Sequence, residues 1–175
     1  MTCTTNARLA GFTLLLYIAA GIASLVLAGN APATAVLSLV TSLSALVLGV
    51  TLYAITREQD PDLAMLGLSC RVIEAVPGPG EFFFAVGSAI FCWLLLRGRM
   101  IPIGLAWLGA IASVLLTMLL PLQIAGFFGG PRAWSSPVTW AVWLPLLVFE
   151  LALAVWLITK GVARPARSQA RDNPE

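Results

Sequence analysis

The sequence predicts an all-α fold, a polytopic transmembrane helical bundle of six helices with the N-terminus and the C-terminus in the cytoplasm. Of the 175 residues, 59% are hydrophobic and only 10% are charged, whereas soluble domains carry about 25% charged residues. Long apolar runs recur along the whole chain. They are continuous rather than alternating in polarity, which favours helices over the strands of a β-barrel, because a helix satisfies its own backbone hydrogen bonds in lipid.

Turn and cap residues divide these runs into six segments. Pro61 follows Asp60 and Pro137 follows Ser136, so each proline is expected at the first position of a helix whose N-cap precedes it. The expected helices cover about 9–29, 34–56, 61–76, 81–96, 102–121 and 137–160. Together they form a single transmembrane helical domain, residues 1–160, and residues 161–175 form a polar cytoplasmic tail.

The basic residues predict the orientation. With six crossings, the N-terminus, the turns near 57 and 97, and the C-terminus all lie on one side of the membrane. That side has Arg8, Arg57, Arg97, Arg99, Lys160, Arg164, Arg167 and Arg171, and the opposite side has only Arg132. Because lysine and arginine concentrate in cytoplasmic loops, both termini are expected in the cytoplasm.

Three charged residues lie deep inside the expected helices, too far from the helix ends to belong to loops: Arg71, Glu74 and Glu150. Counting 1.5 Å per residue from the cytoplasmic side places Arg71 at a depth of about 12 Å, Glu150 at about 15 Å and Tyr17 at about 12 Å. A charge at a helix centre costs roughly 2.5–3.5 kcal/mol on insertion scales, so unpaired contact with lipid is unfavourable. Arg71 is therefore expected to bond Glu74 on its own helix face, or Glu150, or both.

This cluster has two interpretations. A buried Arg–Glu pair can simply fix the register of the helices. Alternatively, it forms a polar pocket in which Glu150 and Glu74 are the candidate catalytic residues and the candidate ligand-binding residues are Arg71, Tyr17 and Glu81. Two carboxyl groups face one guanidinium, so one of them is expected to stay protonated and to serve as a proton donor. For Glu81, a cap that suits the dipole at a helix start is the alternative role.

Several common chemistries are not expected. The chain contains no histidine, which removes the usual metal ligand and the usual acid–base group near neutral pH. Cys3, Cys70 and Cys92 have no ligand-like spacing and are expected to be free thiols. We therefore expect no metal site and no cofactor. No basic tract indicates nucleic acid as a partner.

Short motifs occur in order along nearly the whole chain: Arg8-Leu9-Ala10-Gly11, Arg71-Val72-Ile73-Glu74-Ala75, Arg97 to Ile101-Pro102, Phe149-Glu150, Trp156-Leu157-Ile158 and Lys160-Gly161. This ordered set resembles the bacterial domain of unknown function 4386 (DUF4386) family of small multi-pass membrane proteins. The chain departs from the family pattern after the third helix, where its connection is only residues 77–80. The resemblance implies a multi-pass protein of the cell inner membrane and implies no activity.

Three classes of function remain open on the sequence. The first, which we favour, is a protein that holds a lipophilic small molecule in an intramembrane polar pocket and acts on it by carboxylate general-acid chemistry. The second is a small proton-coupled transporter, which at this length is expected to form a homo-oligomer. The third is a non-catalytic scaffold or accessory membrane subunit. A cavity that reaches Glu150 favours the first two, and a filled core with a closed Arg71–Glu150 pair favours the third.

Overall fold

The computed structural model describes residues 3–76, 80–129 and 136–163. These residues form six α-helices, one short 3₁₀ helix and no strand, which confirms the predicted all-α class: α1 (Cys3–Val26), α2 (Ala31–Thr56), α3 (Pro61–Glu74), α4 (Gly80–Arg97), α5 (Ile103–Ile124), η1 (Phe127–Gly129) and α6 (Pro137–Thr159). Most of the predicted 77–80 connection, Arg132 and the tail from residue 164 lie outside the described residues.

The helix starts follow the local sequence. Oδ1 of Asp60 accepts a hydrogen bond of 3.1 Å from the Leu63 backbone N–H, with Pro61 directly after the cap. Ser136 holds the cap position of α6, and its side chain makes no capping hydrogen bond in the part of the chain that the structure describes. α1 begins at Cys3 and α2 at Ala31, earlier than the apolar runs predict, because a helix keeps its own backbone hydrogen bonds where it leaves the hydrocarbon.

Five of the six helices are long and apolar enough to cross a bilayer, and α3 is the exception among the described helices. Its 14 residues rise about 21 Å at 1.5 Å per residue, against a hydrocarbon core of about 30 Å. α3 ends at Glu74, so both of its deep charged residues, Arg71 and Glu74, lie in its last turn. These helices indicate a multi-pass membrane protein whose environment is the lipid bilayer.

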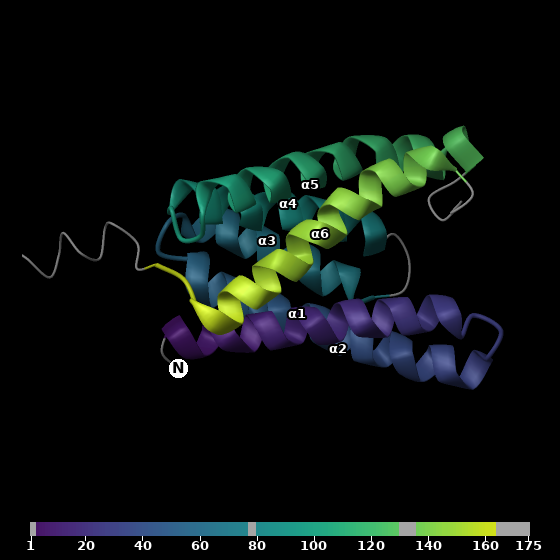
Figure 1. Cartoon of the computed structure of the whole chain (residues 1–175), viewed down its shortest axis with the longest axis horizontal. Helices are drawn as coiled ribbons and strands as arrows, with labels where there is room; N and C mark the ends of the chain where they lie inside the picture. The colour runs from purple at the N-terminus through teal and green to yellow at the C-terminus, as the bar shows by residue number, and fades with distance from the viewer. Residues whose placement is uncertain (1–2, 77–79, 130–135, 164–175) are drawn as a thin grey trace, which may run out of the picture.

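The six helices form a closed ring in chain order. Each helix packs against the next, and α6 packs back against α1. In Figure 1, α1 and α2 lie side by side along one edge, α5 lies along the opposite edge, and α6 crosses diagonally from α5 to α1. A glycine makes the closing contact possible, because a Cβ at Gly11 of α1 would lie 2.8 Å from the backbone oxygen of Ala154 in α6.

The segments that carry most of the basic residues meet at one end of this ring. Arg97, at the end of α4, lies 3.5 Å from the carboxylate of Asp60, before α3. The backbone N–H of Ala163 donates to the carbonyl of Met100 at 3.1 Å, so the chain after α6 joins the same end. This arrangement agrees with the topology that the positive charges predict. Which side of the membrane this end faces stays a prediction.

Candidate functional site

Arg71 lies in the last turn of α3 and faces the interior of the ring, with its side chain 3% exposed. Its Nη1 donates to Oε2 of Glu74 at 2.8 Å, and its Nη2 donates to Oγ of Ser88 in α4 at 2.8 Å. Its Cζ also lies 4.9 Å from the centre of the Phe84 ring, a cation–π contact. The guanidinium therefore joins α3 to α4 through one carboxylate, one hydroxyl and one aromatic face.

Glu74 uses both of its carboxylate oxygens. Oε2 accepts from Arg71, and Oε1 accepts a hydrogen bond of 2.6 Å from the hydroxyl of Tyr17 in α1. The Glu74 side chain is 6% exposed, and charge-assisted hydrogen bonds of this kind are the strong ones. The result is a continuous chain of polar contacts, Tyr17–Glu74–Arg71–Ser88, that connects α1, α3 and α4. We call it the polar chain. The sequence singled out Tyr17 by its expected depth in the membrane, and the fold brings its hydroxyl onto Glu74.

Glu150 of α6 does not join the polar chain. It is buried, yet within the described parts of the chain it makes no hydrogen bond and no ion pair. The predicted option of a direct Arg71–Glu150 bond is therefore wrong for this structure. The physical reason is that both terminal nitrogens of Arg71 are directed to Glu74 and Ser88. The other predicted bond, between Arg71 and Glu74, is present.

A small cavity inside the ring brings Arg71, Ser88 and Glu150 to a common space of about 20 Å³. Its remaining lining is apolar apart from a thiol: Leu14, Leu48, Leu52, Phe91, Cys92, Leu95, Phe149, Leu153 and Leu157. A site for one water needs about 10–15 Å³ and two to four polar partners. The Nε of Arg71 is buried without a hydrogen-bond partner in the described structure. The cavity thus has the size and the polar groups for one water molecule.

An aromatic row lies beside the polar chain. The rings of Tyr17 and Phe84 are stacked with centres 6.0 Å apart, and those of Phe84 and Trp143 with centres 6.1 Å apart. These residues come from α1, α4 and α6, three of the helices that surround the cavity. Sequence reasoning missed Ser88, Phe84 and Trp143. Ser88 carried a usable signal, as a hydroxyl inside an apolar run, whereas aromatic residues are too common in such runs to single out two of them.

The remaining predicted residues are more peripheral. Glu81 lies half-buried in the first turn of α4 and does not line the cavity. This position suits the cap role, because a carboxylate is stabilised near the N-terminus of a helix. Cys70 and Cys92 are buried free thiols, as predicted, and Cys92 contributes its side chain to the cavity wall. The side chain of Cys3 lies outside the described structure.

The fold and its interior define a class: an all-α, multi-pass membrane protein with a polar chain and an additional buried carboxyl group inside a ring of helices. The family model of the domain of unknown function DUF4386 matches residues 79–161, which span α4 to α6 and include Ser88 and Glu150. This match confirms the predicted resemblance to the DUF4386 family. No curated protein and no solved structure gives a significant match to the chain.

Proposed function

We propose that this protein is a small proton-coupled membrane carrier in which Glu150 takes up and releases the proton. The observation that supports this best is the position of the Glu150 side chain. It is buried in the interior of the ring, has no hydrogen-bonding or ionic partner among the described residues, and borders a cavity that also touches Arg71 and Ser88. Buried ionisable residues inside membrane proteins commonly act in proton relays.

The balance of charges supports the assignment to Glu150 rather than to Glu74. Arg71 brings one positive charge, and Glu74 takes it in a direct ion pair of 2.8 Å. Among the described residues, the carboxyl group of Glu150 has no counter-charge in contact, and an unpaired buried ion costs several kcal/mol. Binding a proton to Glu150 removes that cost, whereas protonating Glu74 would break its ion pair with Arg71. The proton that is exchanged therefore belongs to Glu150.

The cavity supplies a partner for the exchange. A single water in about 20 Å³ would hydrogen-bond both Glu150 and Ser88. A proton that leaves Glu150 would cross this water to solvent outside the ring when the ring opens, and Glu150 would take up the next proton by the same route. Proton transfer needs only groups within hydrogen-bond reach or one water apart. Arg71 also borders the cavity, and its Nε–H, which has no partner in the described structure, is a further hydrogen-bond donor. Together these groups give Glu150 a polar neighbour in an otherwise apolar interior.

The two other classes that the sequence left open have less support. A lipophilic small molecule does not fit in about 20 Å³, so general-acid chemistry on such a substrate at Glu150 would require the ring to open. A scaffold is supported by the polar chain, because Tyr17 and Arg71 tie three helices together. A scaffold role does not explain why Glu150 is buried without a partner among the described residues. A proton-coupled carrier explains it, because such a carrier needs a group that can take up and release a proton.

Two measurements test the proposal on the full chain in lipid. The first records infrared difference spectra between acidic and alkaline pH, where a protonated carboxyl group in apolar surroundings gives a separate C=O stretching band. We expect this band in the natural protein and in Glu58→Gln, which removes a solvent-exposed carboxylate, and we expect it to be absent in Glu150→Gln.

The second measurement follows proton entry into proteoliposomes with an internal pH-sensitive dye under an imposed membrane potential. Glu150→Gln should abolish the flux, and Glu58→Gln should leave it unchanged. Because Gln matches Glu in shape, thermal unfolding is expected to show that both variants fold. A Glu150→Gln protein that keeps both the infrared band and the flux would overturn the proposal, and empty liposomes provide the background.

A further inference from the structure

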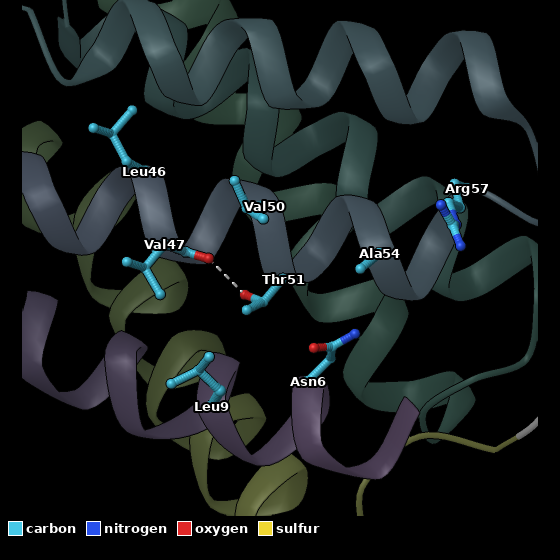
Figure 2. Close-up of a pocket in the computed structure, with 8 residues that line it drawn as sticks. All are labelled: Asn6, Leu9, Leu46, Val47, Val50, Thr51, Ala54 and Arg57. Carbon is cyan, nitrogen blue, oxygen red and sulfur yellow. Dashed lines mark hydrogen bonds between the residues drawn. The ribbon is translucent and has the colours of Figure 1, made fainter. Parts of the chain in front are cut away.

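A second hollow lies on the outside of the ring, away from the polar chain. It is an open groove of about 510 Å³ between the first half of α1 and the second half of α2 (Figure 2). Its walls are formed by Asn6, Leu9, Leu46, Val47, Val50, Thr51, Ala54 and Arg57. None of these residues takes part in the polar chain or borders the inner cavity, so the groove needs an explanation of its own.

We propose that this groove is a binding site for one anionic phospholipid. One acyl chain lies along the apolar wall, and the headgroup phosphate binds Arg57, with Asn6 as a hydrogen-bond donor. The lipid comes from the leaflet at the end of the bundle where α1 starts and α6 ends. This inference does not rest on the proton-carrier proposal, because the two sites share no residue.

The middle of the groove is apolar. Leu9, Leu46 and Val50 are 36%, 37% and 57% exposed. The one hydroxyl in this part belongs to Thr51, and it donates to the backbone oxygens of Val47 at 2.9 Å and Leu48 at 3.0 Å. Figure 2 shows the Thr51–Val47 bond as a dashed line. Since that hydroxyl is satisfied within its own helix, this part of the groove favours a hydrocarbon chain over a polar molecule.

One end of the groove is polar and positively charged. α1 and α2 are consecutive antiparallel helices, so Asn6 near the start of α1 lies at the same end as Arg57 after the last turn of α2 (Figure 2). Within the described structure, neither side chain has a hydrogen-bond or ion-pair partner. The nearby Asp60 carboxylate already accepts from Leu63 and Arg97. Arginine is the side chain best suited to bind phosphate, because its planar guanidinium group can donate two parallel hydrogen bonds to the phosphate oxygens.

The length of the groove matches one leaflet. Leu46 of α2 and Arg57, directly after the end of α2, are eleven residues apart, which corresponds to about 16 Å at 1.5 Å per residue. Half of a hydrocarbon core of about 30 Å is about 15 Å. A chain that starts at a phosphate on Arg57 would therefore reach the mid-plane near Leu46. Basic pockets between transmembrane helices are a known setting for anionic headgroups.

Native mass spectrometry of the purified full chain in detergent tests this site, with added phosphatidylglycerol as the anionic probe and phosphatidylcholine of the same acyl chains as the neutral one. We expect one phosphatidylglycerol to bind more tightly than phosphatidylcholine. Arg57→Gln should weaken phosphatidylglycerol about fivefold and leave phosphatidylcholine unchanged. Arg99→Gln, which alters an exposed arginine of another turn, is the matched control and should leave both lipids unchanged.

A substitution in the groove tests where the acyl chain lies. Val50→Trp should fill the groove and abolish the bound lipid. Val36→Trp is the control, because it places the same side chain on the exposed face of α2, away from the groove. The Val36→Trp protein should still bind the lipid. Thermal unfolding checks that both variants fold. Equal affinity for the two lipids, or equal losses in Arg57→Gln and Arg99→Gln, would overturn headgroup recognition. Undiminished binding in a folded Val50→Trp protein would overturn the groove as the site.

Discussion

Gly49 of α2 lies directly against Arg71 of α3. A Cβ atom at position 49 would be 2.8 Å from the Cβ of Arg71 and 3.3 Å from its Cγ, closer than side chains normally approach. Because position 49 has no side chain, α2 can pack against the turn of α3 that carries the guanidinium. The side chain of Arg71 then reaches Glu74 in its own helix and Ser88 in α4. Small residues are common at such contacts in membrane bundles.

Adding a methyl group at this contact should separate α2 from α3. Gly49→Ala is expected to lower the free energy of unfolding by about 1–3 kcal/mol, the usual range for overpacking. Thermal unfolding in detergent measures the change. Gly21→Ala is the matched control, because Gly21 lies within α1 and a Cβ atom there would have no described neighbour within 4 Å. If both substitutions lowered the free energy of unfolding equally, the close Gly49–Arg71 contact would not be the cause of the loss.

Removing the guanidinium should be costly because it leaves a carboxylate alone in the interior. Arg71→Met is expected to lower the free energy of unfolding by about 3–5 kcal/mol. Adding Glu74→Gln to Arg71→Met should recover part of the loss, since no unpaired charge then remains at this position. Arg99→Met, at an exposed turn, should have little effect. Strict additivity of the Arg71 and Glu74 substitutions would argue against coupling between the two side chains.

The hydroxyl of Tyr17 connects α1 to the polar chain, so its removal tests that connection. Tyr17→Phe should lower the free energy of unfolding by about 1.5–3 kcal/mol, because the lost hydrogen bond is to a charged group. Tyr53→Phe is the control, since the Tyr53 hydroxyl makes no hydrogen bond among the described residues. Chemical unfolding followed by far-ultraviolet circular dichroism measures both. An equal effect of the two substitutions would show that the Tyr17–Glu74 bond adds nothing to stability.

The orientation of the bundle is a separate prediction from the basic residues. A fluorescent protein fused after residue 175 should fluoresce, because both termini are expected in the cytoplasm. Alkaline phosphatase inserted in the turn between α1 and α2, residues 27–30, should be active, because that turn is expected outside the cytoplasm. Swapping the two reporters provides the controls. The reverse pattern would invert the topology and would move the phospholipid groove to the outer leaflet.

Much of the fold could be predicted from the sequence because lipid restricts the backbone so strongly. Continuous apolar runs must become helices there, and the prolines at 61 and 137 mark two of the starts. The short length of α3 was harder to predict. The apolar character of the chain continues to Val76, while the helix itself ends at Glu74, before the proline and glycine residues from 77 onward. A run of apolar residues predicts which part of the chain contacts lipid, but it does not predict at which residue the helical hydrogen bonds end.

The candidate site was only partly predictable for a geometric reason. Residue counting predicts the depth of Arg71, Glu74 and Glu150 along a helix axis. The cost of an unpaired charge in lipid predicts that they face the interior, and all three side chains are buried. Whether two side chains at one depth meet depends on how each helix is rotated and how the helices cross. Glu74 shares the α3 face of Arg71, so that pair follows from the helical repeat. Glu150 lies on α6, whose packing against α1 and α5 no local pattern specifies.

The sequence by itself thus determined the class of the fold, the six helices and the burial of three charged residues, because hydrocarbon allows few alternatives for the backbone and for charge. Only the tertiary structure decided which carboxyl group pairs with Arg71. It also decided that Glu150 borders a water-sized cavity and that Asn6 and Arg57 share the end of one groove. These relationships arise between helices, where close packing of side chains sets rotation and spacing.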